Sequence, residues 1–136
     1  MTPPICPYCN SASVLVGGDA IYPHRPDLYQ FKFWQCAPCD AFVGCHKLGA
    51  IVDGVRSDGT LPLGRLANAE LRKAKRSAHA AFDPLWHNGY FDSRRDAYKW
   101  LAKKLGISRK VCHIGMFDVT QCRMVVSHCN AFLEAT

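Results

Sequence analysis

The sequence predicts an α+β protein, in which a small N-terminal antiparallel sheet is packed with a C-terminal bundle of about three helices. Turn-rich segments that alternate apolar and polar residues fill the first part of the chain, with a Cys-x-x-Cys motif near each end. From Gly64 onward the apolar residues recur at helical spacing instead. We therefore expect a sheet domain over 1–48, a linking loop over 49–63 and a basic helical domain over 64–136.

The composition is that of an ordinary globular chain. It has 136 residues, of which 49% are hydrophobic and 21% are charged. No run of about 18 apolar residues is present, so we expect no membrane-spanning helix. The first residues, Met1 to Cys6, lack the basic and apolar regions of a secretory signal. These observations favour a cytoplasmic location.

Four cysteines have metal-ligand spacing. Cys6 and Cys9 form one Cys-x-x-Cys pair, and Cys36 and Cys39 form a second pair after 26 residues. In a reducing compartment such pairs bind metal rather than form disulfides, and soft thiolates favour zinc. Four protein ligands leave no open position for water. We therefore predict one structural zinc ion that builds a zinc ribbon and performs no chemistry.

The expected ribbon strands follow from the same stretch. Ser13–Val16 and the glycines after it indicate a strand that enters a turn, and Asp19–Tyr22 is expected to continue the hairpin. Two prolines make 23–27 a loop. Tyr29–Gln35 alternates aromatic and polar residues, which predicts a half-buried strand leading into the second cysteine pair. Within the linking loop, 50–52 suits a short strand.

Three helices are expected after Gly64. The first starts near Arg65 and is broken by Asp83-Pro84, because a residue before proline disfavours helical geometry. The second starts at Ser93 and stops at Gly106. The third starts at Asp118, with Gln121 as its capping-box partner. Their expected apolar faces are Ala67, Leu71, Ala74, Ala78, Ala81 and Phe82; Ala97, Leu101 and Leu105; and Cys122, Val125, Val126, Cys129, Phe132 and Leu133.

Two alternative metal arrangements stay open at this point. Cys45 or His46, just beyond the second pair, is able to replace Cys39 as a ligand, although a buried cysteine beside a polar histidine is the simpler interpretation. A second site is conceivable from a C-terminal set of cysteines and histidines, but two of its members lie on an apolar helix face. That set is Cys112, His113, Cys122, His128 and Cys129.

Catalytic signatures are weak. His79 and Asp83 lie one helical turn apart, with His87 beyond, and such a group is able to hold a catalytic ion. The simpler interpretation is a solvated polar face. No nucleophile motif, phosphate-binding glycine loop or His-Glu-x-x-His is present. The sequence thus favours a protein that is not an enzyme.

Charge is unevenly distributed along the chain. The formal net charge is +6, but residues 65–110 carry twelve Lys and Arg against four Asp and Glu, a net +8, and the rest carries −2. Cations on helix faces are typical of nucleic-acid binding, and strand aromatics suit stacking on bases. The plainer alternatives are a solvated helix face and aromatics buried as ribbon core. The candidate contacts are Arg65, Arg72, Lys75, Arg76, Arg95, Lys99, Lys103, Tyr29, Phe31 and Phe33.

Several motifs carry a resemblance to known families. The stretch from Cys36 to His46 resembles the second knuckle of the C4 zinc ribbons in bacterial type I topoisomerase tails, which bind single-stranded DNA. Nearly the whole chain resembles an uncharacterised bacterial and phage family described as a zinc-finger-containing domain. The matching pieces are Cys6–Cys9, Gly44–His46, Pro62–Asn68, Phe82–Trp86, Ala97–Leu101 and Cys112–Asp118. The resemblance implies a zinc-binding fold and a phage or bacterial origin, and it implies no activity.

These observations favour a small non-enzymatic zinc-ribbon protein, encoded by a phage, that binds DNA or RNA through its basic helical half. A second hypothesis is a protein-interaction module or inhibitor that targets a host protein. A third is a metal-dependent nuclease that uses His79, Asp83 or His87.

Overall fold

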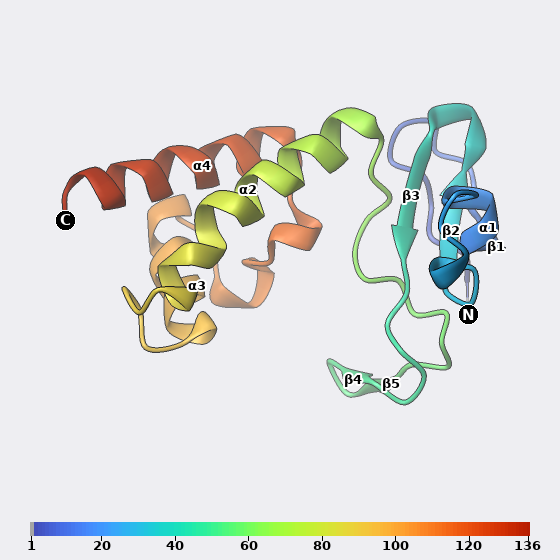
Figure 1. The fold of residues 1–136 in the computed structure, drawn as a ribbon, viewed down its shortest axis with the longest axis horizontal. Helices are drawn as coiled ribbons and strands as arrows, with labels where there is room; N and C mark the ends of the chain where they lie inside the picture. Colours follow the sequence, from blue (N-terminus) through green and yellow to red (C-terminus); the bar gives the residue numbers. More distant parts are fainter. Residues whose placement is uncertain (1) are drawn as a thin grey trace. The chain divides into compact units, whose positions relative to one another are not determined.

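The computed structural model describes residues 2–136, which form two compact units, residues 2–69 and 70–136. The first unit contains a small antiparallel sheet and the cysteine cluster, and the second consists of helices (Figure 1). The α+β fold class is therefore confirmed. The predicted domain boundaries at 48 and 63 stay a prediction.

The sheet has three antiparallel strands in the order β1-β2-β3. They are β1 (Val14–Gly17), β2 (Lys32–Cys36) and β3 (Ala41–Gly44). Strand β1 was predicted, β3 was not, and β2 starts three residues later than predicted. The amide N–H groups of Tyr29 and Phe31 bond to the carbonyls of Pro26 and Leu28 instead of a strand, because a 3-10 turn over Pro26–Leu28 precedes β2.

The predicted continuation of the first hairpin is wrong. After β1 the chain forms one helical turn, α1 (Gly18–Ile21), closed by the Tyr22 N–H bonding the Gly18 carbonyl at 2.7 Å. A Cβ atom at Gly18 would lie 1.8 Å from the Leu28 carbonyl oxygen. The close approach of these two backbone segments therefore requires glycine at this position.

The two faces of the sheet differ. Leu15, Trp34 and Val43 are register partners on the core face, where Trp34 is 6% exposed and its indole N–H donates to the Thr60 carbonyl at 2.7 Å. On the outer face, Phe33 and Phe42 meet edge to face with ring centroids 6.1 Å apart. Tyr22 packs edge to face on both rings. The outer face is thus a half-exposed aromatic surface.

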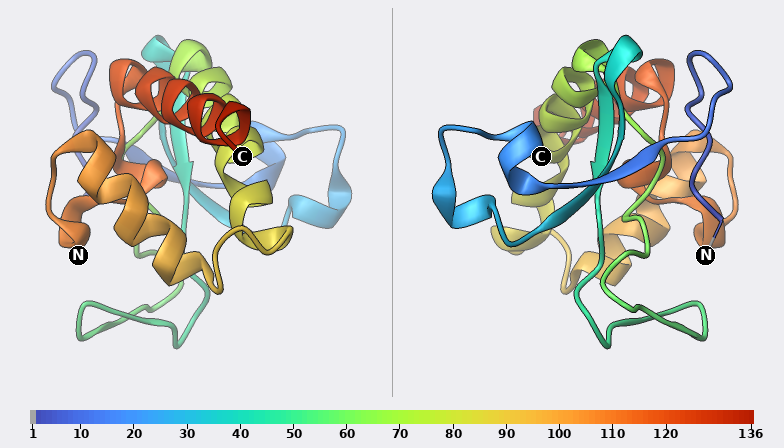
Figure 2. Two further views of the ribbon diagram at one scale, coloured as in Figure 1. Left: turned by 90° about the vertical axis from the view of Figure 1, so that its left-hand side faces the viewer. Right: turned by 90° about the vertical axis from the view of Figure 1, so that its right-hand side faces the viewer.

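A second hairpin joins β4 (Ile51–Val52) to β5 (Val55–Arg56), which confirms the short strand expected at 50–52. Its turn places Asp53 at φ 50° and Gly54 at φ 80°, in the left-handed region. The hairpin lies apart from the three-stranded sheet (Figure 2).

The second unit has the three expected helices, α2 (Ala69–His87), α3 (Arg94–Leu105) and α4 (Val119–Glu134). The ends of α3 are as predicted, with Ser93 as N-cap and Gly106 as a left-handed C-cap. The capping box of α4 is also as predicted, with Asp118 and Gln121 bonding each other's backbone N–H groups. These ends depend on local side-chain chemistry, which the sequence displays directly.

The predicted limits of the first helix are wrong at both ends. The helix starts at Ala69, so Arg65 and Ala67 precede it, and it continues through Pro84 to His87. A proline inside a helix costs about 3 kcal/mol. Phe82 and Leu85 on either side of Pro84 are fully buried, and each contributes about 1.5–3 kcal/mol by leaving water. The burial of these two side chains therefore offsets the free-energy cost of Pro84, and the helix continues.

The core of the helical unit draws on every helix and on the segment before α4. Most of the predicted inward positions are buried, while Leu133 is 37% exposed. The fully buried large side chains of this unit are Leu71, Phe82, Leu85, Leu101, Cys112, Ile114, Phe117, Cys122, Val125 and Cys129. Among the described residues, no helix combines the length and apolarity needed to cross a membrane.

Candidate metal centre

The first cysteine pair sits in a tight loop before β1. The Cys6 N–H bonds the Ser11 carbonyl at 2.8 Å, and the Asn10 N–H bonds the Cys6 carbonyl at 2.9 Å. Asn10, directly after Cys9, has φ 66°, in the left-handed region that Asn tolerates better than most residues. The loop thus reverses the chain immediately after both thiols.

The second pair repeats this arrangement between β2 and β3. Cys36 ends β2, Cys39 lies in a 3-10 turn over Ala37–Cys39, and the Asp40 N–H closes that turn on the Ala37 carbonyl at 3.1 Å. Asp40, directly after Cys39, has φ 50°. Asn10 and Asp40 are structural residues of the site that the sequence analysis did not identify. The signal was an Asx residue after each Cys-x-x-Cys pair.

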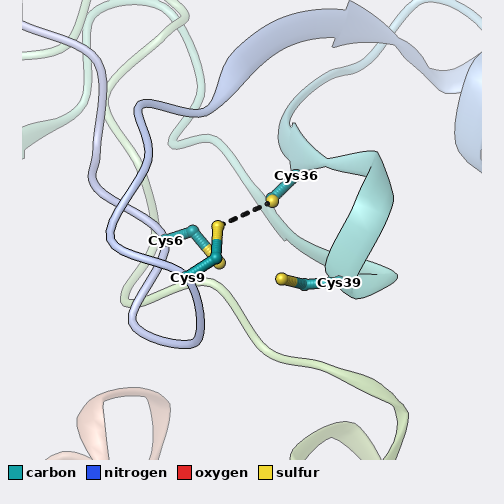
Figure 3. A group of neighbouring side chains, drawn as sticks. All are labelled: Cys6, Cys9, Cys36 and Cys39. Carbon is teal, nitrogen blue, oxygen red and sulfur yellow. Dashed lines mark hydrogen bonds between the residues drawn. The ribbon is translucent and has the colours of Figure 1, made fainter.

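The four thiols converge on one point. Their sulfur atoms all lie within 4.8 Å of one another, and Cys9 Sγ is 3.6 Å from Cys36 Sγ (Figure 3). Zinc–sulfur bonds of about 2.3 Å in a tetrahedron place sulfur atoms roughly 3.8 Å apart. All eight cysteines of the chain are free thiols in the structure. The donor set and its spacing therefore fit one structural zinc ion.

The electrostatics of the cluster also suit a metal. Hydrogen bonds from the Ser11 hydroxyl and backbone lower the pKa of Cys9 to about 6. The pKa of Cys39 is raised to about 12, first by its hydrogen bond with Cys9 and then by burial. Without a cation Cys9 is thus the more acidic of these two thiols, and Cys39 keeps its proton. A zinc ion displaces the Cys39 proton, because thiolates rather than thiols ligate it.

The cluster is also part of a small core. Cys6 and Cys36 are buried with Trp34, Ala41 and Leu66, and this set is the hydrophobic core around the site. A metal bound here ties the N-terminal loop to the β2–β3 turn. With four protein ligands the ion has no open position for substrate, so its role is structural.

Cys45 and His46 lie outside the cluster. Within the described residues, the one group of three or more close potential ligands consists of Cys6, Cys9, Cys36 and Cys39. Cys45 packs half-buried against the core around the site, and burial raises the pKa of its thiol. This environment matches the simpler interpretation of that cysteine.

The C-terminal cysteines behave as core residues. Cys112, Cys122 and Cys129 are fully buried, and burial raises the pKa of each thiol, to about 12 for Cys129. Across residues 2–136 they form no group with His113 or His128 that meets the spacing of a metal site. Protonated thiols among apolar side chains are packing groups.

The candidate catalytic ion site has two of its members in contact. His79 Nδ1 lies 3.8 Å from an Asp83 carboxylate oxygen, and Asp83 also accepts from the Trp86 indole N–H at 3.3 Å. His87 stacks on the Trp86 ring, with centroids 3.8 Å apart. Among the described residues these three do not form a ligand cluster.

The cations proposed for nucleic-acid contact fall into two classes. Arg76 on α2 and Arg95, Lys99 and Lys103 on α3 are exposed. Lys75 is half-buried, and its ammonium donates to the Gly115 carbonyl at 2.6 Å. Arg65 and Arg72 are half-buried, and Arg65 precedes the helix.

The three candidate aromatic side chains lie in different surroundings. Phe33 belongs to the aromatic face of the sheet, in contact with Tyr22 and Phe42. Tyr29 is 41% exposed and its hydroxyl donates to the Pro23 carbonyl. Phe31 is 43% exposed and lines a groove beside β2 and β3.

A family model described as a zinc-finger-containing domain matches residues 2–131 of the chain. Searches of curated proteins and of solved structures gave no match. The family match covers nearly the whole of both units, and the cysteine cluster supplies the zinc-binding feature of the description.

Proposed function

The chain belongs to this family of zinc-finger-containing domains, and on that premise we propose that it is a non-enzymatic zinc-ribbon protein that binds DNA or RNA through its basic helical half. The observation that carries the proposal is the charge on the helical unit. Residues 70–136 contain twelve Lys and Arg against six Asp and Glu, a net +6, while residues 1–69 contain five of each. Such an excess attracts the phosphate backbone.

The exposed cations of α3 support this proposal further. Arg95, Lys99 and Lys103 follow one another at four-residue steps, which places them on one side of the helix. Within the part of the chain that the structure describes, none of them has an acidic partner within 4.0 Å. Charges that are not neutralised by the protein are available to phosphates.

The proposed setting is the cytoplasm of a bacterial cell infected by the phage that encodes the protein. The resemblance of the whole chain to a bacterial and phage family supports this origin, and the resemblance of Cys36–His46 to topoisomerase ribbons supports nucleic acid as the ligand. Discovery of the gene among bacterial housekeeping genes, away from phage or prophage sequence, would count against the phage origin.

The test is binding across a salt series, measured by fluorescence anisotropy with labelled oligonucleotides. The variant Lys99→Gln/Lys103→Gln removes two charges from α3, and the control Arg25→Gln/Arg56→Gln removes two exposed charges from the first unit, of which Arg25 is paired with Asp27. We expect the slope of log K against log salt to fall by about 1.5 for the α3 variant only, since each lost phosphate contact contributes about 0.7–0.9. Equal slopes for both variants, or no binding at low salt, would refute the proposal.

A further inference from the structure

A groove at the Phe33–Gly44 end of β2 and β3, away from their Cys36–Ala41 end, is lined mainly by apolar side chains of the first unit. It has a volume of about 430 Å³, inside the range of about 300–1,000 Å³ usual for ligand sites. Phe31, Leu48 and Leu63 line it and are 43%, 79% and 53% exposed. Large apolar side chains that gather at one exposed hollow indicate a binding surface.

One wall of the groove is closely packed around a glycine. Gly44 on β3 pairs directly with Phe33 on β2, and a methyl group at Gly44 would lie 3.3 Å from Leu63 Cδ1 and 3.6 Å from the Phe33 ring. Leu63 and the Phe33 ring therefore pack over Gly44 and form one apolar wall of the groove. Phe31 lines the same groove and is 43% exposed, so its ring is accessible to a planar ligand.

The charges around the groove are positive. Lys32 and Lys47 line it, and the lining residues that the structure describes include no aspartate or glutamate. Asp58 is an acidic group that acts electrostatically on Cys45, one of the lining residues. Its carboxylate accepts hydrogen bonds from the Thr60 N–H and hydroxyl. The rim is thus suited to anions while the wall is suited to an aromatic face.

We infer that this groove holds an unpaired base of a single-stranded nucleic acid, with Phe31 as the stacking platform and Lys32 and Lys47 on the adjacent phosphates. The inference rests on the proposed function and adds to it a single-stranded substrate and a second contact surface. A paired base does not fit this role, because its faces are covered by its neighbours in the duplex. Tyr29 is not part of this surface.

The experiment compares three labelled probes with the zinc-loaded full chain. They are an oligothymidylate of about twelve nucleotides, the same phosphate chain without bases, and a duplex of about twelve base pairs. We expect the oligothymidylate to bind tighter than both others. Phe31→Ala is expected to weaken its binding by about 5- to 150-fold, as for loss of one stacked base, and to leave the base-free probe unchanged.

Tyr29→Ala is the matched control, because Tyr29 is equally exposed and lies outside the groove. Gly44→Val is a second test, since its side chain displaces Leu63 and Phe33 in the wall of the groove without a change of charge. Amide shifts in the unmodified protein provide a readout that needs no variant, with changes on oligothymidylate addition expected at Phe31, Gly44 and Leu48. Zinc content confirms that each variant is folded.

The possible failures are distinguishable. Equal affinity for the base-free probe, or tighter binding of duplex, overturns the base-binding groove while the proposed function stands. Tighter binding of an aromatic peptide than of any oligonucleotide overturns it in favour of a protein partner. The base-binding groove is also overturned if Lys99→Gln/Lys103→Gln abolishes oligonucleotide binding while Phe31→Ala leaves the affinity unchanged. If instead Phe31→Ala abolishes binding and the α3 variant has no effect, the groove stands and the role of the basic helices fails.

Discussion

The two units are nearly equal in length but are stabilised in different ways. Among the described residues, the first unit buries six hydrophobic side chains, and two of these, Cys6 and Cys36, are metal ligands. The helical unit buries fourteen hydrophobic side chains, which it draws from α2, α3, α4 and the segment before α4. A chain of this size with so small a core depends on a metal, whereas a helical bundle with a continuous core does not.

Charge divides the units in the same way. Residues 1–69 are neutral by sequence and become −2 when four thiolates hold one zinc ion, while residues 70–136 carry +6. The region with the recognisable motif is thus not the region with the strongest electrostatic attraction for phosphate. The proposed groove gives the zinc-binding unit its own means of binding nucleic acid, because it places cations and an aromatic wall on that otherwise neutral unit.

Metal removal is the largest expected effect and the sharpest test of this contrast. Chelation of zinc is expected to unfold residues up to Ala69 and leave the helices folded, because structural zinc contributes apparent binding energies of about 10–16 kcal/mol to small domains. The measurement is the amide spectrum of the labelled full chain before chelation, after it and after zinc is restored.

Cys45→Ser is the control for that experiment, because Cys45 lies beside the core around the site but outside the ligand set. It should bind one equivalent of zinc, and Cys36→Ser should not. Loss of both sets of amide signals together would show that the two units unfold as one, and the helical unit would then not be stable without zinc.

Truncation of a side chain in the core of the helical unit is expected to have the next largest effect on stability. Phe82 is fully buried and packs on Tyr98 with ring centroids 4.6 Å apart. Phe82→Ala is expected to cost about 3–5 kcal/mol and to lower the urea midpoint of the helical signal, with zinc content unchanged. Val111→Ala, at a side chain that is 59% exposed, should leave the midpoint within error. A loss of zinc in Phe82→Ala would contradict independent stabilisation of the units.

Local signals explain what the sequence predicted well. The Cys-x-x-Cys pairs, the Ser93 and Gly106 ends of α3 and the capping box of α4 are each formed by residues within a few positions of one another. Their chemistry does not depend on what lies on the far side of the fold. Sequence reasoning therefore identified them with the correct residues.

Tertiary burial explains the errors. The sequence shows the helix-breaking property of Pro84 but not that Phe82 and Leu85 are buried on either side of it. Strand β3 was missed because it has only four residues, too few for a clear alternation, and its limits are set by pairing with β2. The groove was missed for the same reason, because its lining residues Phe31, Gly44 and Leu63 are distant in the sequence and come together only in the fold. The sequence therefore could not show that Phe31 lines the groove and Tyr29 does not.

A smaller effect is expected at the close approach of α1 to the segment before β2. Gly18→Ala places a methyl group 1.8 Å from the Leu28 carbonyl, so the backbone must shift, at a cost of about 1–3 kcal/mol. Gly17→Ala is the matched control, because its methyl group meets the Asp19 carboxylate, a side chain that is able to rotate away. Zinc affinity measured by competition with a chromophoric chelator should fall for Gly18→Ala alone. Equal affinities would mean that the α1 segment is not coupled to the metal centre.

The smallest effect is expected at the capping box of α4, and it tests how much this local interaction contributes to the stability of the helical unit. Asp118 accepts the Gln121 N–H at 2.8 Å, and the Gln121 side chain accepts the Asp118 N–H at 3.1 Å. Asp118→Ala removes the first bond, and with it a negative charge at the helix N-terminus, at a cost of about 1 kcal/mol. In a unit of this size that corresponds to a fall in melting temperature of about 4–8 °C. Ser127→Ala, an exposed change within the same helix, should not move it. The shift must appear in the helical transition alone, with zinc affinity unchanged, because the cap stabilises only the unit that folds without metal.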